Sequence, residues 1–284
     1  MFPEFWQIGF SVKGLRAPDE IMLNDNILIR GTPHDDAYVF LKVTIENEED
    51  KNSLRDDMMI VLNNILHMYG LISNQHTQLQ SGSVHAQISS ENPFGYTKYS
   101  PDALGFLPMP TVQQREENTS FLSKTVEKYN LVKNFANNKR KRFLLNAIEY
   151  YNRSLGNYNN EVKLIDLMIC LESLFSRENQ ELRLRYSLRI SQLLGSNEQE
   201  KIPEIFRNVY ALYSKRSKIV HGSEDVKLND KDIRIFRNYL KEAIKIFIHI
   251  EVSKEFLLNL LDESVYDLAK RERLGQLVCA RAQQ

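Results

Sequence analysis

Short apolar runs rich in strand-forming residues, separated by turn residues, dominate the first part of the chain. They cover residues 5–12, 21–29, 38–45 and 78–89. The third run reads YVFLKVTI and has the two-residue period of a strand that buries one face. Residues 54–69 change to the ~3.6-residue period of a helix, and Gly70 follows as a stop signal. These patterns predict a mixed α/β domain.

Breaker residues and helical periodicity organise the rest of the chain. Residues 90–110 carry four prolines and two glycines, which predicts a linker with the domain boundary in it or just after it. Beyond residue 118, apolar positions recur with helical spacing. The predicted helices cover residues 121–135, 142–155, 162–175, 182–194, 202–220, 230–252 and 256–274. Glycines stand just past three of them, at Gly156, Gly195 and Gly222, and Asn229 or Asp230 is the predicted N-cap of the longest.

The predicted fold class is therefore α+β, with an N-terminal mixed α/β domain followed by an all-α helical bundle. A length of 284 residues favours two domains. Residues 1–115 form the first, to which we assign a sensing or regulatory role. Residues 116–284 form the second, whose core covers about 140–253.

Charge is balanced overall but unevenly distributed. The 37 basic and 37 acidic residues give a net charge of zero, so a nucleic-acid partner must be argued from local clusters. Residues 177–221 carry nine basic residues against five acidic, and residues 1–60 carry twelve acidic against six basic. The basic cluster fits a phosphate-binding face and solvated helix surfaces equally well.

Cysteine usage and hydropathy exclude several classes. Cys170 and Cys279 are the two cysteines, and neither has metal-ligand spacing to other residues, so no metal and no cofactor is expected. This usage fits a reducing, cytoplasmic compartment. No apolar run reaches the ~20 residues of a membrane span, and the first ten residues do not read as a signal peptide.

One segment carries a recognisable pattern of functional residues. Residues 210–222 read YALYSKRSKIVHG, in which Arg216 precedes His221 by five positions at the end of a predicted helix. Of the six histidines, only His221 has an arginine at this offset. Upstream, residues 164–175 read LIDLMICLESLF and residues 182–195 read LRLRYSLRISQLLG. Together these segments resemble the Apea-like branch of the HEPN superfamily, over roughly residues 139–254.

The resemblance implies a metal-independent endoribonuclease that acts as a homodimer through the helical domain, with Arg216 and His221 of each chain in one cleft. A histidine can take the proton of a 2′-hydroxyl or protonate the leaving 5′-oxygen, and an arginine stabilises charge on the phosphorus. One histidine cannot be base and acid in the same step, so the facing copies would share these roles. Many active members have Asn, Asp or His after the arginine, and Ser217 in that position weakens the case for catalysis.

Further residues are candidates for supporting roles. Glu172 would orient His221 or pair with Arg216, or else be a surface carboxylate or a structural salt bridge. Ser217 would support the catalytic pair. The candidates for holding RNA phosphates, each of which also fits a solvated surface role, are Lys215, Lys218, Arg185 and Arg189. A five-residue step turns ~140° around a helix, so His221 must lie in the last turn or cap to approach the side of Arg216.

The sequence thus favours an RNA-cleaving, toxin-like effector in phage defence or a stress response, with RNA and a second copy as partners and no membrane role. A regulatory partner is unknown. The alternative is a non-catalytic HEPN scaffold for dimerisation or for binding nucleotides or RNA. In that case Arg216 would stabilise the helix C-terminus and His221 would hydrogen-bond locally.

Overall fold

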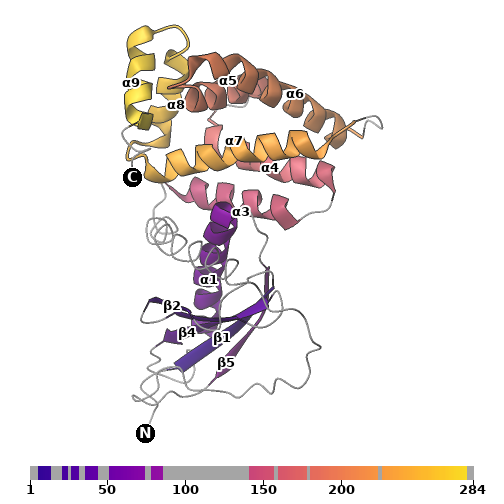
Figure 1. The fold of residues 1–284 in the computed structure, drawn as a ribbon, viewed down its shortest axis with the longest axis vertical. Coiled ribbons are helices and arrows are strands. Elements are labelled where there is room, and N and C mark those ends of the chain that lie inside the picture. The colour runs from indigo at the N-terminus through magenta and orange to yellow at the C-terminus, as the bar shows by residue number, and fades with distance from the viewer. Residues whose placement is uncertain are drawn as a thin grey trace, which may run out of the picture. The chain divides into compact units, whose positions relative to one another are not determined.

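The computed structural model describes two parts of the chain. Elements of the first part are described at residues 6–13, 21–24, 27–31, 36–43, 51–73 and 78–85, with side chains only at 62–73. The second part covers residues 141–156, 159–177, 180–222 and 226–279. The chain divides into two compact units, Met1–Lys133 and Asn134–Gln284 (Figure 1). The predicted linker at 90–110, the predicted boundary near residue 115 and the predicted helix at 121–135 lie outside the described residues.

The described backbone of the first unit forms a five-stranded sheet and a helix. The elements are β1 (Trp6–Lys13), β2 (Ile21–Asn24), β3 (Ile27–Gly31), β4 (Asp36–Val43), α1 (Lys51–Ser73) and β5 (Gln78–His85). The strand order is β2-β3-β4-β1-β5, and every neighbouring pair is antiparallel. Ile8 of β1 lies opposite Leu41 of β4 and Val84 of β5, so β1 is an inner strand.

The predicted α+β class, with a mixed α/β domain before the bundle, is wrong for the part of the chain whose side chains the structure describes. Those residues form helices and contain no strand or sheet. The strands of the first unit are described by their backbone alone, and their antiparallel pairing does not require the crossover helices of a parallel α/β sheet. The alternating pattern predicted strands from local sequence, but it did not establish that their side chains pack into a mixed α/β domain.

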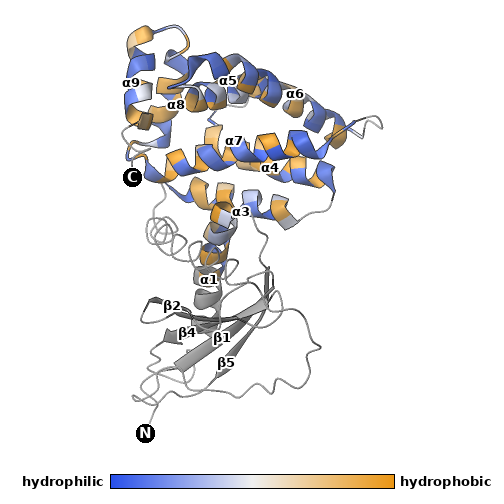
Figure 2. Cartoon of the chain, viewed as in Figure 1, coloured by the Kyte–Doolittle hydropathy of each residue, from blue (hydrophilic) through white to orange (hydrophobic). Residues whose placement is uncertain are grey.

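The second unit is a bundle of helices. Its elements are α3 (Arg142–Gly156), α4 (Asn160–Phe175), α5 (Leu182–Leu194), the short 3₁₀ helix η3 (Gln199–Lys201), α6 (Ile202–Val220), α7 (Asp230–His249), α8 (Lys254–Glu263) and α9 (Leu268–Cys279). The apolar α4 packs against α3, α5, α6 and α7, and Leu167, Leu171 and Leu174 are fully buried there. The amphipathic α7 carries apolar and polar residues along its whole length (Figure 2) and buries Phe236 and Leu240.

Polar caps and Gly222 set several helix ends. The Asn229 side chain accepts a hydrogen bond from the backbone N–H of Asp232 at 2.7 Å, which makes Asn229 the N-cap of α7. α7 ends at His249, three residues before the predicted end. The predicted helix at 256–274 is two helices, because the Asp267 carboxylate accepts from the N–H groups of Ala269 and Lys270 and starts α9. None of the helices in the described parts of the chain is long and apolar enough to cross a membrane.

Candidate functional site

Helix α6 presents Arg216 to the interior of the bundle and His221 to its surface. Ile205, Val209 and Leu212 form the buried face of α6, and Arg216 follows Leu212 one turn later on the same face. The Arg216 side chain is therefore only 27% exposed. His221 is the C-cap of α6, with φ −89° and ψ 9°, and is exposed. A half-buried cation and an exposed imidazole thus come from one helix end.

Two side chains lie near the Arg216 guanidinium, and a third packs beside one of them. Its Nη2 lies 3.9 Å from Oε1 of Glu172 on α4. The Tyr213 ring lies 5.9 Å from the guanidinium carbon, and the Tyr213 hydroxyl hydrogen-bonds the Glu172 carboxylate. The ring of Tyr186, on α5, lies 6.0 Å from that of Tyr213. We call these four residues the Arg216 cluster, which joins α4, α5 and α6.

Burial outweighs ion pairing at Glu172. Removal from water raises the pKa of the Glu172 carboxyl, while Arg216 and the hydrogen bond from Tyr213 act to lower it. Burial, followed by the nearby Glu172 charge, also raises the pKa of Tyr213. At 3.9 Å the contact between Arg216 and Glu172 exceeds hydrogen-bonding distance. The cluster therefore holds a carboxylate that is only loosely neutralised.

The Arg216 guanidinium retains an unused donor. Its Nε–H is buried and has no hydrogen-bond partner among the described residues. An unsatisfied buried donor of this kind costs about 1–3 kcal/mol. An anion that reached the guanidinium would accept this hydrogen bond and remove the cost.

The end of α6 fixes the backbone at His221. The His221 N–H donates to the Ser217 carbonyl at 3.1 Å, and the Gly222 N–H donates to the Ile219 carbonyl at 3.0 Å. Gly222 has φ +73°, in the left-handed region. Within the described parts of the chain, the His221 imidazole has no hydrogen-bond or ion-pair partner. The structure joins Arg216 to Glu172 and leaves the imidazole accessible.

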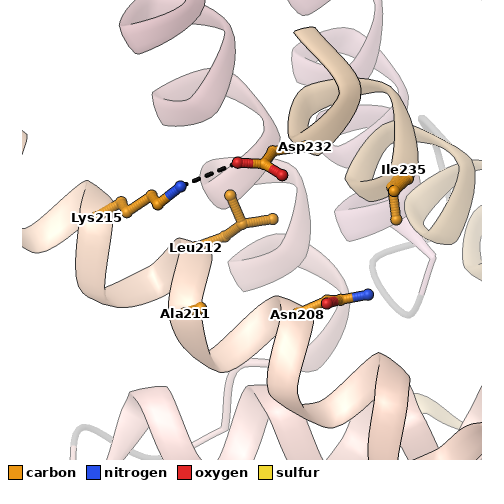
Figure 3. A pocket seen from close by; sticks show the side chains of 6 residues that line it. All are labelled: Asn208, Ala211, Leu212, Lys215, Asp232 and Ile235. Atoms are coloured by element: carbon orange, nitrogen blue, oxygen red, sulfur yellow. Dashed lines mark hydrogen bonds and ion pairs between the residues drawn. The ribbon is translucent and has the colours of Figure 1, made fainter. Parts of the chain in front are cut away.

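The proposed phosphate-binding residues are distributed over different surfaces. Lys215 points towards α7, where its Nζ lies 2.9 Å from Oδ2 of Asp232 at the edge of a small pocket (Figure 3). Lys218 is exposed, without an acidic partner among the described residues. Nη2 of Arg185 lies 3.8 Å from Oε2 of Glu181, the residue that precedes α5. Of these three, Lys218 is the one free to meet a phosphate without breaking an ion pair.

Arg189 is not a phosphate-binding residue, and that prediction was wrong. Its side chain is 0% exposed. Nε and Nη2 donate to the two carboxylate oxygens of Asp262 at 2.8 and 2.7 Å, and Nη1 donates to the Phe175 carbonyl at 2.8 Å. A phosphate cannot reach a fully buried guanidinium whose donors are already occupied. Arg189 instead holds α5 against α8 and the end of α4.

Sequence reasoning singled out Arg216, His221 and Glu172, and did not include the two tyrosines of the cluster as site residues. The spacing contained the missing signal, because Tyr213 precedes Arg216 by three positions and shares its side of α6. For Glu172, orienting His221, pairing with Arg216, and a surface or structural salt-bridge role were all open. The structure places the carboxylate beside Arg216, which fits both the functional pair and a structural salt bridge.

Among the described residues, no group of three or more His, Cys, Asp or Glu side chains is placed to hold a metal ion. No family model matches this chain, and no curated protein or solved structure matches it either. Any functional assignment must therefore be argued from the site itself.

Proposed function

We propose that the helical unit is a metal-independent endoribonuclease of the HEPN type, with Arg216 and His221 as its catalytic residues. The observation that carries this proposal is the buried, unpartnered Nε–H of Arg216, five residues before an exposed imidazole. A phosphodiester is an anion that would complete the hydrogen bonding of the guanidinium. The His221 imidazole at the helix end is exposed, so a substrate hydroxyl can approach it.

The reaction requires two histidines, which a homodimer would supply. One His221 would take the 2′-hydroxyl proton, and the His221 of a second copy would protonate the departing 5′-oxygen. Arg216 would stabilise the charge on the pentacoordinate phosphorus. The products would be a 2′,3′-cyclic phosphate and a 5′-hydroxyl, and DNA would not be cut because it lacks the attacking group.

Glu172 would neutralise Arg216 while the site is empty. Its partial burial and its long contact with the guanidinium favour exchange for a phosphate oxygen, which can form shorter, bidentate hydrogen bonds with arginine. Tyr213 would keep the displaced carboxylate in place. From the resemblance we further infer a role in phage defence or a stress response, in which the N-terminal unit restrains cleavage.

The alternative, a non-catalytic scaffold of the same type, is favoured by one observation. The contacts among Glu172, Tyr213 and Arg216 join helices far apart in sequence, as structural contacts do. If this were their whole role, Arg216→Ala would lower the melting temperature without affecting any RNA. His221→Ala would then be silent in every assay.

The deciding experiment is RNA cleavage with EDTA present, comparing the full chain with His221→Ala. Because the imidazole is exposed and makes no contact among the described residues, we expect the variant to melt at the wild-type temperature. The wild type should cut RNA to products with 2′,3′-cyclic phosphate ends, and the variant should not. Cleavage that persists in His221→Ala, or that EDTA abolishes, would contradict the proposal.

A further inference from the structure

Three cations on α5 and α6 lack a carboxylate partner among the described residues. Helices α5 and α6 carry seven basic residues and one acidic residue, Glu204. Four of the seven are paired with acids from elsewhere, and these are Arg185, Arg189, Lys215 and Arg216. The remaining three, Arg183, Arg207 and Lys218, leave uncompensated positive charge. Such a surface attracts a polyanion.

An aromatic stack lies among these cations. The rings of Phe206 and Tyr210 are stacked, with centroids 5.6 Å apart and planes inclined by 24°. The Arg183 guanidinium lies 4.2 Å from the Tyr210 centroid, and its Nη1 donates to the Ser214 hydroxyl at 3.1 Å. Both rings are half-buried and Arg183 is exposed. We call Arg183, Phe206 and Tyr210 the stacking strip. The hydrogen bond to Ser214 holds the Arg183 guanidinium in place.

The stacking strip runs along the side of α6 that leads to His221. At ~100° per residue, Arg207, Lys218 and His221 all lie within about 80° of Tyr210 around the helix axis. Tyr210 and His221 are separated by ~16 Å along the axis. The positions between them within about 80° of Tyr210 are Tyr213, Ser214, Ser217, Lys218 and Val220, and the Arg183 guanidinium donates to the hydroxyl of Ser214.

We infer that the stacking strip binds unstacked bases of single-stranded RNA, with Arg207 and Lys218 holding the phosphates that lead to His221. This inference rests on the proposed function, because it names the form of the substrate for the same helix. Bases stack on aromatic rings and on the planar guanidinium groups of arginines. The faces of the bases are accessible for such stacking only where RNA is unpaired. The neighbouring uncompensated cations match the charge of the backbone. Double-stranded RNA hides its base faces and gains nothing from the strip.

The test measures binding by fluorescence anisotropy with three labelled probes. These are a single-stranded RNA of about a dozen nucleotides, the single-stranded DNA of the same sequence and the RNA duplex. Tyr210→Leu and Phe206→Leu remove one ring each, and Tyr239→Leu removes a half-buried ring from α7 as the control. We expect each strip variant to bind both single strands roughly tenfold more weakly. Tyr239→Leu, and duplex binding by all variants, should not change.

Two further variants separate stacking from folding and from charge. Tyr210→Phe keeps the ring and should bind single strands within about twofold of the wild type. Arg207→Gln should weaken the binding of every probe and reduce the salt dependence of binding by about one phosphate contact. Arg234→Gln, on α7, is the control and should change neither. Unchanged affinity in Tyr210→Leu and Phe206→Leu proteins that melt normally would overturn the inference. Equal affinity of the wild type for duplex and single strands would overturn it as well.

The DNA probe distinguishes this inference from the proposed nuclease. DNA lacks the 2′-hydroxyl, so binding to it requires the stacking strip and not the reaction. If binding depends on the stacking strip but the protein cuts no RNA, the inference holds and the proposed nuclease activity is wrong. Conversely, if Tyr210→Leu cleaves RNA with an unaltered KM, the nuclease activity holds and the inference about the stacking strip is wrong.

Discussion

The Nη2 atom of Arg216 lies 3.9 Å from Oε1 of Glu172, and the two side chains are 27% and 28% exposed. The distance is too long for a hydrogen bond, although both groups are charged and partly removed from water. The Tyr213 hydroxyl also hydrogen-bonds the carboxylate. Glu172 therefore neutralises Arg216 without saturating it, which makes the carboxylate a competitor of any incoming phosphate.

Replacing Glu172 with glutamine should release this competition. The Glu172→Gln variant should bind single-stranded RNA several-fold more tightly, because an arginine without a counter-charge interacts more strongly with phosphate. Anisotropy titration at fixed salt measures the change. Asp232→Asn, which removes the partner of Lys215 on the other side of α6, is the matched control and should have a smaller effect. Weaker binding by Glu172→Gln would mean that the carboxylate positions Arg216 for the phosphate.

The buried ion pair between Arg189 and Asp262 should dominate the stability of the bundle near α8. Asp262→Asn removes the counter-charge from a guanidinium that is 0% exposed, and we expect a loss of about 3 kcal/mol in the free energy of unfolding. Urea denaturation measures it. Glu181→Gln removes the partner of the partly exposed Arg185 and should cost less than about 1 kcal/mol. Equal losses in the two variants would refute a structural role specific to Arg189.

The sequence predicted individual helices best where an amphipathic pattern and a stop signal coincide. Helices α5 and α6 run from Leu182 to Leu194 and from Ile202 to Val220, as predicted, with Gly195 and Gly222 just beyond them. The break between α8 and α9 was missed because residues 264–267 contain neither glycine nor proline. Asp267 starts α9 through its side chain, and apolar periodicity cannot register such a cap.

The site was predictable as far as local spacing reaches. Arg216 and His221 belong to one segment, and Tyr213 would have followed from helical geometry. The burial of Arg189 was not predictable, because its counter-charge lies 73 residues further along the chain. Nor could spacing decide whether Glu172 meets His221 or Arg216, since that depends on how α4 packs against α6. Long-range pairing determines which cations on these helices are left without a carboxylate partner among the described residues.

Lys254 should make stability depend on pH in the alkaline range. Burial, reinforced by Arg189, lowers the pKa of Lys254 to about 8 from its ordinary 10.5, while its Nζ donates to the Ser173 carbonyl at 2.8 Å. Between these two values the unfolded chain binds more protons than the folded one, so the free energy of unfolding should rise with pH. Below pH 8 the penalty should be constant. Denaturation of the wild type and Lys254→Met across this window measures the difference, and parallel curves would contradict the assignment.

Gly222 should connect the end of α6 to catalysis. Its φ of +73° is costly for a residue with a Cβ, and an added Cβ would meet nothing within 4 Å, so only backbone strain opposes substitution. Gly222→Ala should lower the free energy of unfolding by about 1 kcal/mol. It should also reduce the cleavage rate more than RNA affinity, because His221 precedes the strained residue. Thermal melts and single-turnover kinetics measure the two effects. Gly222→Asn should lower both the free energy of unfolding and the cleavage rate by less, because asparagine tolerates the left-handed region. If Gly222→Ala is as active as the wild type, the cap does not position His221.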